Sequence, residues 1–340
     1  MGKIRIAING FGRIGRISTR VLLENSNLEL VAINDLADAH TLAHLFKYDS
    51  IHGRFKGTVE QENNIIIFNG QAVTVYSEKN PAELPWKKEN IDVVLECTGH
   101  FTDKAGATLH LTAGAKRVIL SAPAKGKGDM KSVVIGVNES ILTADDHIIS
   151  NASCTTNNAA PMLKVLDDLG EIETAFVTTV HSYTGDQQIH DAPHKDLRRA
   201  RAAAVSIIPT TTGAAKALGD IMPHLDGKLG GAGIRVPAPD GSLTDITCNL
   251  RKSVTVDEIN RAFKQMANGA MKGILEYTSD PIVSVDIIDN SNSCIFDSLL
   301  TTVLGKMVKV VGWYDNEVGY SNRLIELAQK VGGMIEPDKR

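Results

Sequence analysis

The sequence predicts the α/β fold class, with a doubly wound parallel sheet in a first domain and a mostly antiparallel sheet in a second, α+β domain. Over the first half of the chain, short apolar runs alternate with helical patterns, which is typical of a parallel sheet covered on both faces. The second half carries longer runs of alternating or β-branched residues, which favour antiparallel strands. The length of 340 residues gives room for two domains of ordinary size.

The first domain is expected to span residues 1–153. It opens with a strand of alternating isoleucines over 4–8, a helix with apolar spacing over 14–22 and a second strand over 30–33. Further strands are predicted at 92–96, 117–121, 133–137 and 147–149, and a further helix at 104–113. Because strands and helices alternate, the predicted sheet is parallel.

The second domain is expected to span residues 154–315. Its strands are predicted at 174–183, 245–254, 283–289, 295–302 and 307–314. One helix interrupts them, and the capping-box pair Thr255 and Glu258 marks its start. The last helix, about 322–331, carries an apolar stripe that must pack on another element.

The bulk composition excludes several classes of function. A net charge of −4, from 36 basic and 40 acidic residues, gives no field that would recruit nucleic acid or an anionic membrane. The four cysteines have irregular spacing without a C-x-x-C pair, so neither a metal site nor a disulfide framework is indicated. The N-terminus has no apolar signal core, and no apolar run approaches the ~18 residues of a membrane span. We expect a soluble, cytoplasmic protein.

A dinucleotide site is predicted where the first strand meets the first helix. Gly10, Gly12 and Gly15 form G-x-G-x-x-G at that junction, and Asp35 closes the second strand 20 residues after the last glycine. The glycines permit a tight turn, close approach to a pyrophosphate and close packing of helix on strand, which makes this domain Rossmann-type. Asp35 can accept hydrogen bonds from a ribose diol and repels a 2′-phosphate. The pattern therefore predicts NAD rather than NADP.

A candidate nucleophile lies at the start of the second domain. Cys154 follows Ser153, a good N-cap residue, and precedes an amphipathic run, so it falls in the first turn of a predicted helix. Free backbone N–H groups and the helix dipole would bias the thiol toward thiolate. The alternative is a small buried core residue. Pro161 is expected to kink or interrupt the same helix.

A base and anion-binding groups follow along the chain. His181 stands at the end of the strand predicted over 174–183, which is a rigid place to aim an imidazole, although a surface or core role is the alternative. Basic residues, a threonine-rich segment and an isolated arginine come next, and they suit a phosphate ester. They are Lys195, Arg198, Arg199, Arg201, Thr210, Thr211, Thr212, Gly213 and Arg235. A solvated face or a subunit salt-bridge patch is the alternative for some of the arginines.

Six segments of the chain resemble the phosphorylating glyceraldehyde-3-phosphate dehydrogenase family. They are NGFGRIGR at 9–16, SNASCTTN at 150–157, HSYT at 181–184, LRRARAAA at 197–204, TTTGAAKA at 210–217, and WYDNE followed by GYS at 313–321. The resemblance is nearly collinear over the whole chain. It implies oxidation of glyceraldehyde 3-phosphate with NAD and inorganic phosphate to 1,3-bisphosphoglycerate, in glycolysis and gluconeogenesis.

The resemblance also implies roles for single residues. Cys154 would form a hemithioacetal and then an acyl thioester, and His181 would raise the thiolate fraction and move protons. The cofactor site would comprise Gly10, Gly12, Arg13, Ile14, Asp35, Lys79, Ser121 and Asn316. The substrate's phosphate would lie on Thr184 and Arg235. The attacking phosphate would lie on Ser153, Thr155, Arg199, Thr212 and Gly213.

The family fold implies that residues 316–340 return to the first domain and complete it, and that the chain forms a homotetramer. The sequence departs from the family pattern at Asn158, where a second cysteine is common, at Gly185, at Asp240 with Gly241, and at Val318. None of these departures removes a group that the mechanism uses.

Three other functions are compatible with part of this sequence. The nearest is erythrose-4-phosphate dehydrogenase, which shares the fold, the cysteine and the histidine but usually lacks the HSYT and TTTGAAKA segments. A Cys and His hydrolase or acyltransferase would have no use for the dinucleotide motif. A catalytically idle binding protein on the same fold would be expected to lack Cys154 or His181, and both are present.

Overall fold

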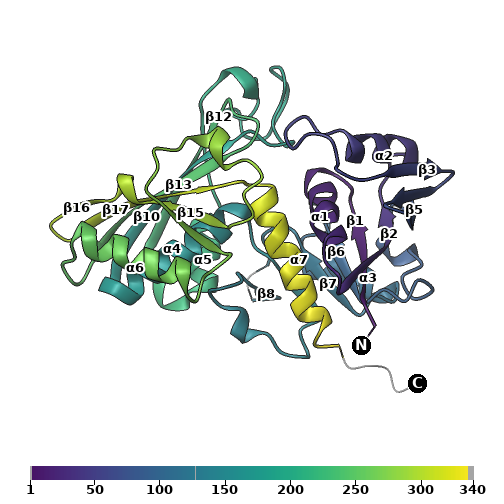
Figure 1. Ribbon diagram of the computed structural model, residues 1–340, viewed down its shortest axis with the longest axis horizontal. Coiled ribbons are helices and arrows are strands. Elements are labelled where there is room, and N and C mark those ends of the chain that lie inside the picture. The colour runs from purple at the N-terminus through teal and green to yellow at the C-terminus, as the bar shows by residue number, and fades with distance from the viewer. Residues whose placement is uncertain (1, 127, 336–340) are drawn as a thin grey trace. The chain divides into compact units, whose positions relative to one another are not determined.

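The computed structural model describes residues 2–126 and 128–335, which form two compact units (Figure 1). The first unit contains residues up to 133 together with 140–152 and 321 onward. The second contains residues 134–139 and 153–320. Within the described ranges, no helix combines the length and the apolar content needed to cross a membrane.

The first unit is built on a mostly parallel sheet with the strand order β3-β4-β5-β2-β1-β6-β7-β9-β8. Its strands are β1 (Ile4–Asn9), β2 (Leu28–Asn34), β3 (Val59–Glu62), β4 (Ile65–Phe68), β5 (Gln71–Tyr76), β6 (Val93–Glu96), β7 (Arg117–Leu120), β8 (Lys131–Ser132) and β9 (Ile148–Ser150). Pairing is parallel from β5 through to β8, whereas β3, β4 and β5 form an antiparallel edge. The parallel sheet confirms the predicted fold class.

Helices α1 (Arg13–Leu23), α2 (Ala39–Lys47) and α3 (Lys104–Thr112) connect the strands of this unit. The last helix, α7 (Val318–Gly332), places its apolar stripe in the core, since Leu324, Leu327, Ala328 and Val331 are fully buried. Gln329 of this helix accepts, through its Oε1, a hydrogen bond of 2.8 Å from Asn25 Nδ2. This hydrogen bond ties α7 to the loop that follows α1.

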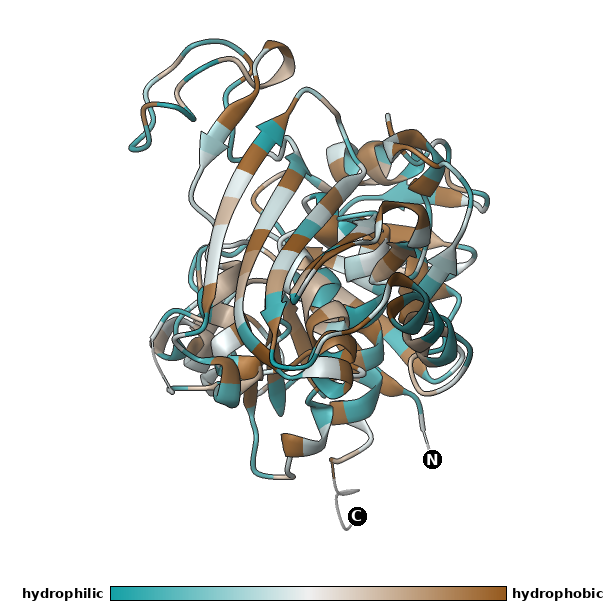
Figure 2. Ribbon diagram, turned by 90° about the vertical axis from the view of Figure 1, so that its left-hand side faces the viewer, coloured by the Kyte–Doolittle hydropathy of each residue, from teal (hydrophilic) through white to brown (hydrophobic). Residues whose placement is uncertain are grey.

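The second unit is built on a mostly antiparallel sheet with the strand order β11-β12-β10-β13-β17-β15-β14, and β16 pairs with β17. Its strands are β10 (Ile172–Ser182), β11 (Ile208–Thr210), β12 (Leu229–Val236), β13 (Ser242–Leu250), β14 (Leu275–Thr278), β15 (Cys294–Asp297), β16 (Thr302–Leu304) and β17 (Met307–Tyr314). Hydrophobic and hydrophilic residues alternate along its long strands (Figure 2). Such alternation is typical of a sheet with two different faces.

Three helices, α4 (Cys154–Gly170), α5 (Ala214–Ile221) and α6 (Val256–Asn268), pack on the strands of this unit (Figure 1). The capping box of α6 is present as predicted, because the Thr255 side chain accepts from Glu258 N and Glu258 Oε2 accepts from Thr255 N. The predicted interruption of α4 is wrong: the helix continues through Pro161 to Gly170. A proline removes only one N–H donor, and the buried apolar face holds the rest of the helix.

Three predicted strands are shorter than expected or absent, because local side chains accept backbone hydrogen bonds. Residues 134–138 turn instead of extending, since Asn138 Oδ1 accepts from Val134 N and Gly136 has a φ of +86°. Residues 284–287 form a 3₁₀ turn in which Asp286 accepts from Val283 N. Strand β15 ends at Asp297, whose side chain accepts from Leu299 N. Polar side chains that compete for backbone N–H groups are a general cause of such breaks.

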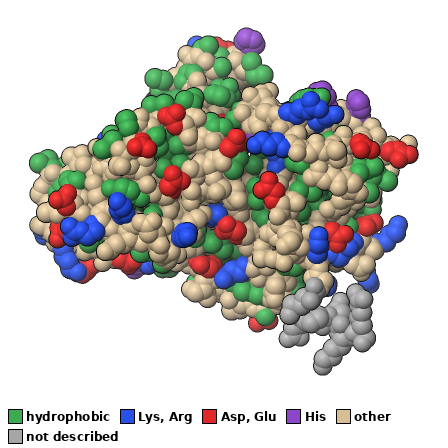
Figure 3. Space-filling view, in the orientation of Figure 1, with side chains coloured by type: hydrophobic (Ala, Val, Ile, Leu, Met, Phe, Trp, Pro, Cys, Tyr) green, Lys and Arg blue, Asp and Glu red, His purple; other side chains and the backbone are tan. Residues whose placement is uncertain are grey.

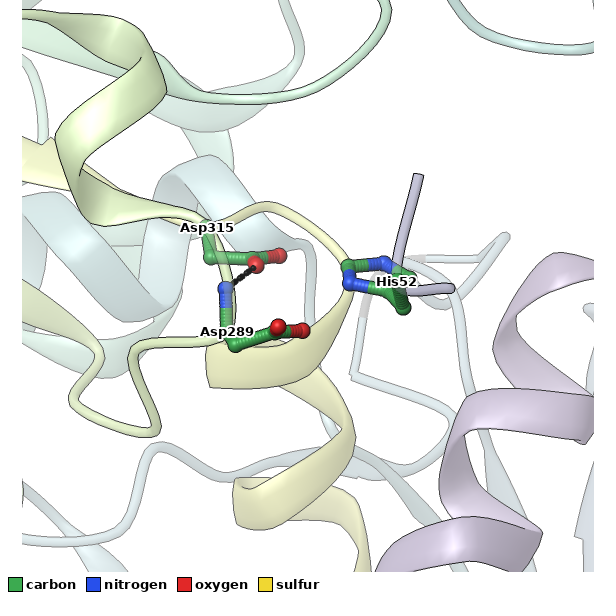
Figure 4. A group of neighbouring side chains, drawn as sticks. All are labelled: His52, Asp289 and Asp315. Carbon is green, nitrogen blue, oxygen red and sulfur yellow. Dashed lines mark hydrogen bonds between the residues drawn. The ribbon is translucent and has the colours of Figure 1, made fainter. Parts of the chain in front are cut away.

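The carboxyl group of Asp240 lies in a buried acidic cluster of the second unit. Asp240, Asp315 and Glu317 are 3%, 1% and 8% exposed. Backbone donors surround the Asp315 carboxylate: its Oδ2 accepts from Asp289 N at 2.8 Å (Figure 4), and its Oδ1 accepts from the N–H groups of Glu317 and Val318. Burial, together with the charges of Asp315 and Glu317, raises the pKa of Asp240 to about 8. Asp240 therefore carries the proton of the cluster.

We expect this cluster to make the second unit less stable as the pH rises. The pKa of Asp240 is higher in the folded state than the ordinary value of 3.8. The folded chain therefore binds more protons between these values, and its stability is lost as the pH rises toward 8. Asp240→Asn should remove this dependence and raise the stability at pH 8 by on the order of 2 kcal/mol.

The measurement is urea unfolding of wild type and variant at pH 5 and pH 8. Asp257→Asn, an exposed substitution on α6, is the matched control and should leave the pH dependence intact. Equal stability differences between wild type and Asp240→Asn at both pH values would contradict the prediction.

Candidate active site

The first unit gathers the predicted cofactor residues at the carboxyl ends of neighbouring strands. Gly10 follows β1, Asp35 follows β2, Lys79 comes after β5 and Ser121 follows β7. Because β5, β2, β1, β6 and β7 are adjacent and parallel, these residues lie along one edge of the sheet. This edge is where open α/β sheets bind their ligands.

The three glycines of the motif have different reasons to be glycine. Gly10 has a φ of +92°, and a Cβ there would lie 2.7 Å from Thr98 N. A Cβ on Gly15 would lie 2.2 Å from Gly10 O, so helix α1 could not approach the loop. A Cβ on Gly12 would meet nothing within 4 Å. Gly10 and Gly15 are therefore required by the fold, and the open space at Gly12 fits close approach of a pyrophosphate.

The glycine loop is held by Asp35 and opens onto the N-terminus of α1. Asp35 Oδ2 accepts from Phe11 N at 2.7 Å, and its Oδ1 accepts from Ala37 N at 3.0 Å. Arg13, the first residue of α1, donates to Asp49 at 2.5 Å. Burial opposes ionisation of Asp49, but the hydrogen bonds from Arg13 and from backbone N–H groups outweigh it and lower its pKa to about 2. Ile14 follows directly, so both residues lie in the first turn of α1.

A buried carboxylate that the sequence did not reveal supports the same loop. Glu96 is 1% exposed and accepts hydrogen bonds from Asn9 Nδ2 at 2.6 Å, from Thr98 N at 2.8 Å and from the ring of His110 at 3.0 Å. Asn9 comes just before Gly10. Glu96 therefore fixes the two backbone segments, at 9–10 and at 97–98, that meet under the glycine turn.

The second unit places Cys154 at the first position of α4. Ser153 is the N-cap, as predicted, and its Oγ accepts from Thr156 N at 3.1 Å. The Thr155 hydroxyl lies 3.0 Å from Tyr314 OH. Cys154 therefore sits beside the free N–H groups that open a helix of 17 residues.

The sheet brings His181 to this helix end. Cys154 Sγ and His181 Nε2 are 3.4 Å apart. The other ring nitrogen, Nδ1, lies 2.8 Å from Ser182 O and 2.8 Å from Arg235 Nη1. Strands β10 and β12 pair in parallel with His181 opposite Arg235, so this contact is set by strand register. The predicted nucleophile, base and one predicted phosphate ligand thus form one cluster.

Burial dominates the ionisation of this cluster. It raises the pKa of the Cys154 thiol, although Arg235 and the donors of Thr155 act in the opposite direction. Burial and the charge of Arg235 lower the pKa of His181 to about 3. The expected bias of the free thiol toward thiolate is therefore wrong, because desolvation exceeds the helix effect. Transfer of the proton from Sγ to Nε2 creates a pair of opposite charges at 3.4 Å, which burial opposes less than either charge alone.

Tyr314 and Asn316 contact the residues on which Cys154 and His181 depend. The ring of Tyr314 lies edge-on to the His181 ring at 5.9 Å, and its hydroxyl contacts Thr155 and Thr179. Asn316 is 5% exposed, and its Oδ1 accepts hydrogen bonds from Ser182 Oγ and from Ser242 Oγ. Tyr314 was missed by the sequence analysis, although it lies inside the WYDNE segment.

The remaining predicted phosphate ligands lie on the segments after β10 and before α5. Thr184 donates its hydroxyl to Asp186, and Arg199 donates to Asp186 at 2.6 Å and to Thr210 Oγ1 at 3.0 Å. Gly213 precedes α5, and Thr212 Oγ1 accepts from Ala214 N at 3.2 Å. Asp186 was not predicted as a site residue, although it stands only two positions after Thr184.

Family comparisons agree with both halves of this arrangement. The family model described as the NAD binding domain of glyceraldehyde 3-phosphate dehydrogenase matches residues 4–104. The model described as the C-terminal domain of the same family matches residues 153–316.

Curated relatives match over nearly their full length. The chain is 55% identical over 336 residues to a glyceraldehyde-3-phosphate dehydrogenase of Streptomyces coelicolor, which covers 98% of this chain and 99% of the relative. It is 53% identical over 335 residues to glyceraldehyde-3-phosphate dehydrogenase 2 of Streptomyces avermitilis, with the same coverage. It is 53% identical over 327 residues to glyceraldehyde-3-phosphate dehydrogenase 1 of Bacillus subtilis, which covers 96% and 97% of the two chains.

Proposed function

The chain belongs to the glyceraldehyde-3-phosphate dehydrogenase family, and from this premise we propose that it oxidises glyceraldehyde 3-phosphate with NAD and inorganic phosphate to 1,3-bisphosphoglycerate. This is a reaction of glycolysis and gluconeogenesis. The observation that carries the proposal is the 3.4 Å approach of Cys154 Sγ to His181 Nε2 at the start of α4. A thiol with an adjacent imidazole is the arrangement that covalent aldehyde chemistry needs.

The first unit is the cofactor domain in this proposal, and NAD supplies the hydride acceptor when it is bound. Open space at Gly12 and the fixed carboxylate of Asp35 fit a pyrophosphate and a ribose diol. The cofactor ligands of this unit would be Gly10, Gly12, Arg13, Ile14, Asp35, Lys79 and Ser121. Asn316, to which the resemblance assigns the nicotinamide amide, belongs to the second unit. The catalytic domain is the second unit, with residues from 321 onward completing the first.

The reaction begins when Cys154 Sγ attacks the aldehyde carbon. His181 Nε2 accepts the thiol proton and passes it to the new oxyanion, which gives a neutral hemithioacetal. Backbone N–H groups at the start of α4 stabilise the oxyanion. His181 then removes the hydroxyl proton as hydride leaves carbon, because hydride loss from the protonated species would build positive charge on that carbon. The product is an acyl thioester on Cys154.

Inorganic phosphate completes the cycle by attacking the thioester carbonyl, so that Cys154 leaves as thiolate and regains its proton from His181. In this proposal the substrate's own phosphate lies on Thr184 and Arg235. The attacking phosphate lies on Ser153, Thr155, Arg199, Thr212 and Gly213. Arginine forks, hydroxyls and a helix N-terminus are suitable donors for both.

The test is NADH formation by the pure protein, followed by absorbance with and without inorganic phosphate. We expect turnover of glyceraldehyde 3-phosphate that requires phosphate. A higher kcat/KM with erythrose 4-phosphate would assign the chain to that related activity instead. Absence of NADH formation with either aldehyde would favour a hydrolase or acyltransferase.

Arg235 has two tasks in this mechanism, because it also contacts the base. In the tautomer in which Arg235 Nη1 donates to His181 Nδ1, the ring proton lies on Nε2, which then cannot accept the thiol proton. A phosphate dianion that draws the guanidinium away lets Nδ1–H donate to Ser182 O, which lies at 2.8 Å, and favours the imidazolium.

We therefore expect Arg235→Lys to discriminate between substrates. It should lower kcat/KM for glyceraldehyde 3-phosphate by about 10- to 100-fold, because lysine cannot form the bidentate contact with a phosphate. The kcat/KM for unphosphorylated glyceraldehyde should change far less. Steady-state kinetics with both aldehydes measures the ratio. Arg201→Lys, at an exposed arginine paired with Asp191, is the matched control. Equal losses for both aldehydes would contradict the assignment.

We further propose a cytoplasmic homotetramer. The 189–207 segment exposes large apolar side chains, with Ile189 and Leu197 81% exposed, Val205 78% and Ile207 69%. Such a concentration on one segment is typical of an interface between subunits. Acidic and basic side chains are interspersed on the face shown in Figure 3, and all four cysteines are free. Sedimentation equilibrium should give four times the chain mass of 36.6 kDa, and a single-chain mass would overturn the proposal.

A further inference from the structure

Asp186 bridges the two groups of residues to which the proposed function assigns phosphate. One carboxylate oxygen accepts the hydroxyl of Thr184, which belongs to the substrate-phosphate group. The other accepts from Arg199 Nη1 at 2.6 Å, and Arg199 belongs to the inorganic-phosphate group. A single internal carboxylate thus occupies donors from both groups.

These contacts are the ones that a phosphate oxygen would make. Carboxylates and phosphates compete for the same arginine forks and hydroxyl donors. Arg199 is also 3.9 Å from Asp196, and its Nε donates to Thr210, so Asp186 holds the outer end of the guanidinium. Burial opposes the ionisation of Asp186, but Thr184 and the charges of Arg235 and Arg199 keep its pKa below the ordinary value. Asp186 is therefore an anion wherever the enzyme works.

We propose that Asp186 is an internal competitor that weakens the binding of phosphate groups at both sites. Its side chain is 46% exposed, so it can swing into solvent when a phosphate takes its place. The reaction makes a product with two phosphate groups, which would dissociate slowly from two strong anion sites. An internal carboxylate that returns to Thr184 and Arg199 lowers the affinity for this product and speeds its release.

The inference rests on the proposed phosphate sites, and Asp186→Asn tests it. Asparagine keeps the size and an acceptor for Thr184 but removes the charge. We expect the Kd for inorganic phosphate, measured by calorimetry on the NAD-saturated enzyme in a phosphate-free buffer, to fall by about 5- to 30-fold. The KM for phosphate should fall with it. Inhibition by 1,3-bisphosphoglycerate should become stronger and kcat lower, because release of the product slows.

Asp191→Asn is the matched control. Asp191 lies on the same segment and pairs with Arg201 at 2.9 Å, and neither residue belongs to the phosphate groups. This variant should change the Kd for phosphate by less than about twofold.

The outcomes separate the inference from the function on which it rests. If wild type binds phosphate and Asp186→Asn binds it equally or more weakly, Asp186 positions Arg199 instead of competing, and the inference is overturned alone. If neither protein binds phosphate, the phosphate sites themselves are misassigned and both proposals fail. Tighter binding by Asp191→Asn as well would show a general effect of charge and would also overturn the inference.

Discussion

Replacement of Cys154 by serine should lower kcat by about 10⁴-fold or more while leaving the affinity for NAD unchanged. The serine hydroxyl has a much higher pKa than a thiol, so His181 generates far less of the nucleophilic anion from it, and serine is a poorer leaving group when phosphate attacks the acyl intermediate. The proposed cofactor residues from Gly10 to Ser121 lie in the first unit, whereas Cys154 belongs to the second. Absorbance at saturating substrates measures kcat, and fluorescence titration measures NAD binding.

Cys248→Ala is the matched control for this experiment. Cys248 is 2% exposed on β13, and burial raises its pKa to about 12, so it is an inert thiol of the same unit. This variant should keep most of its activity, because alanine is smaller than cysteine and cannot overpack the core. If Cys154→Ser kept more than a few per cent of the wild-type rate, the covalent mechanism would be refuted.

Some features of the site are determined by residues that are neighbours in the sequence, and others by contacts between distant elements. Gly10, Gly12 and Gly15 were recognisable because their motif is set by neighbouring residues in one turn. The capping residue Ser153 was recognisable for the same reason. The 3.4 Å contact between Cys154 and His181 depends on how α4 packs against β10, and the contact of His181 with Arg235 depends on the register of β10 with β12. No local pattern carries that information.

Asn158, a departure from the family pattern, also has partners that the local sequence does not reveal. Asn158 stands where a second cysteine is common, and its Nδ2 donates to the carbonyls of Ser293 and Trp313 at 3.2 Å. The side chain thus ties α4 to the ends of β15 and β17. The wrong strand at 283–289 has a similar origin, because its β-branched residues favour a strand until Asp286 caps the turn. In both places a polar side chain decides the structure through a partner that spacing does not reveal.

Replacement of His181 by asparagine should lower kcat by about 10²- to 10⁴-fold and change how the thiol responds to pH. In wild type, burial and Arg235 lower the pKa of His181 to about 3, so the imidazole is neutral above about pH 4. Its Nε2 accepts the thiol proton in the tautomer whose Nδ1–H donates to Ser182 O. Without it, thiolate forms only as the pH approaches the pKa of Cys154, which burial raises.

The rate at which iodoacetamide alkylates Cys154 measures this difference. In His181→Asn the rate should rise about tenfold per pH unit between pH 6 and pH 9, because the thiolate fraction rises in that proportion below the raised pKa. In wild type the rise should be shallower, since Nε2 takes the proton during attack. His147→Asn, at an exposed histidine of the first unit, should behave as wild type. Parallel profiles for wild type and His181→Asn would mean that the contact between Sγ and Nε2 moves no proton, and His181 would then be a residue that positions the thiol rather than its base.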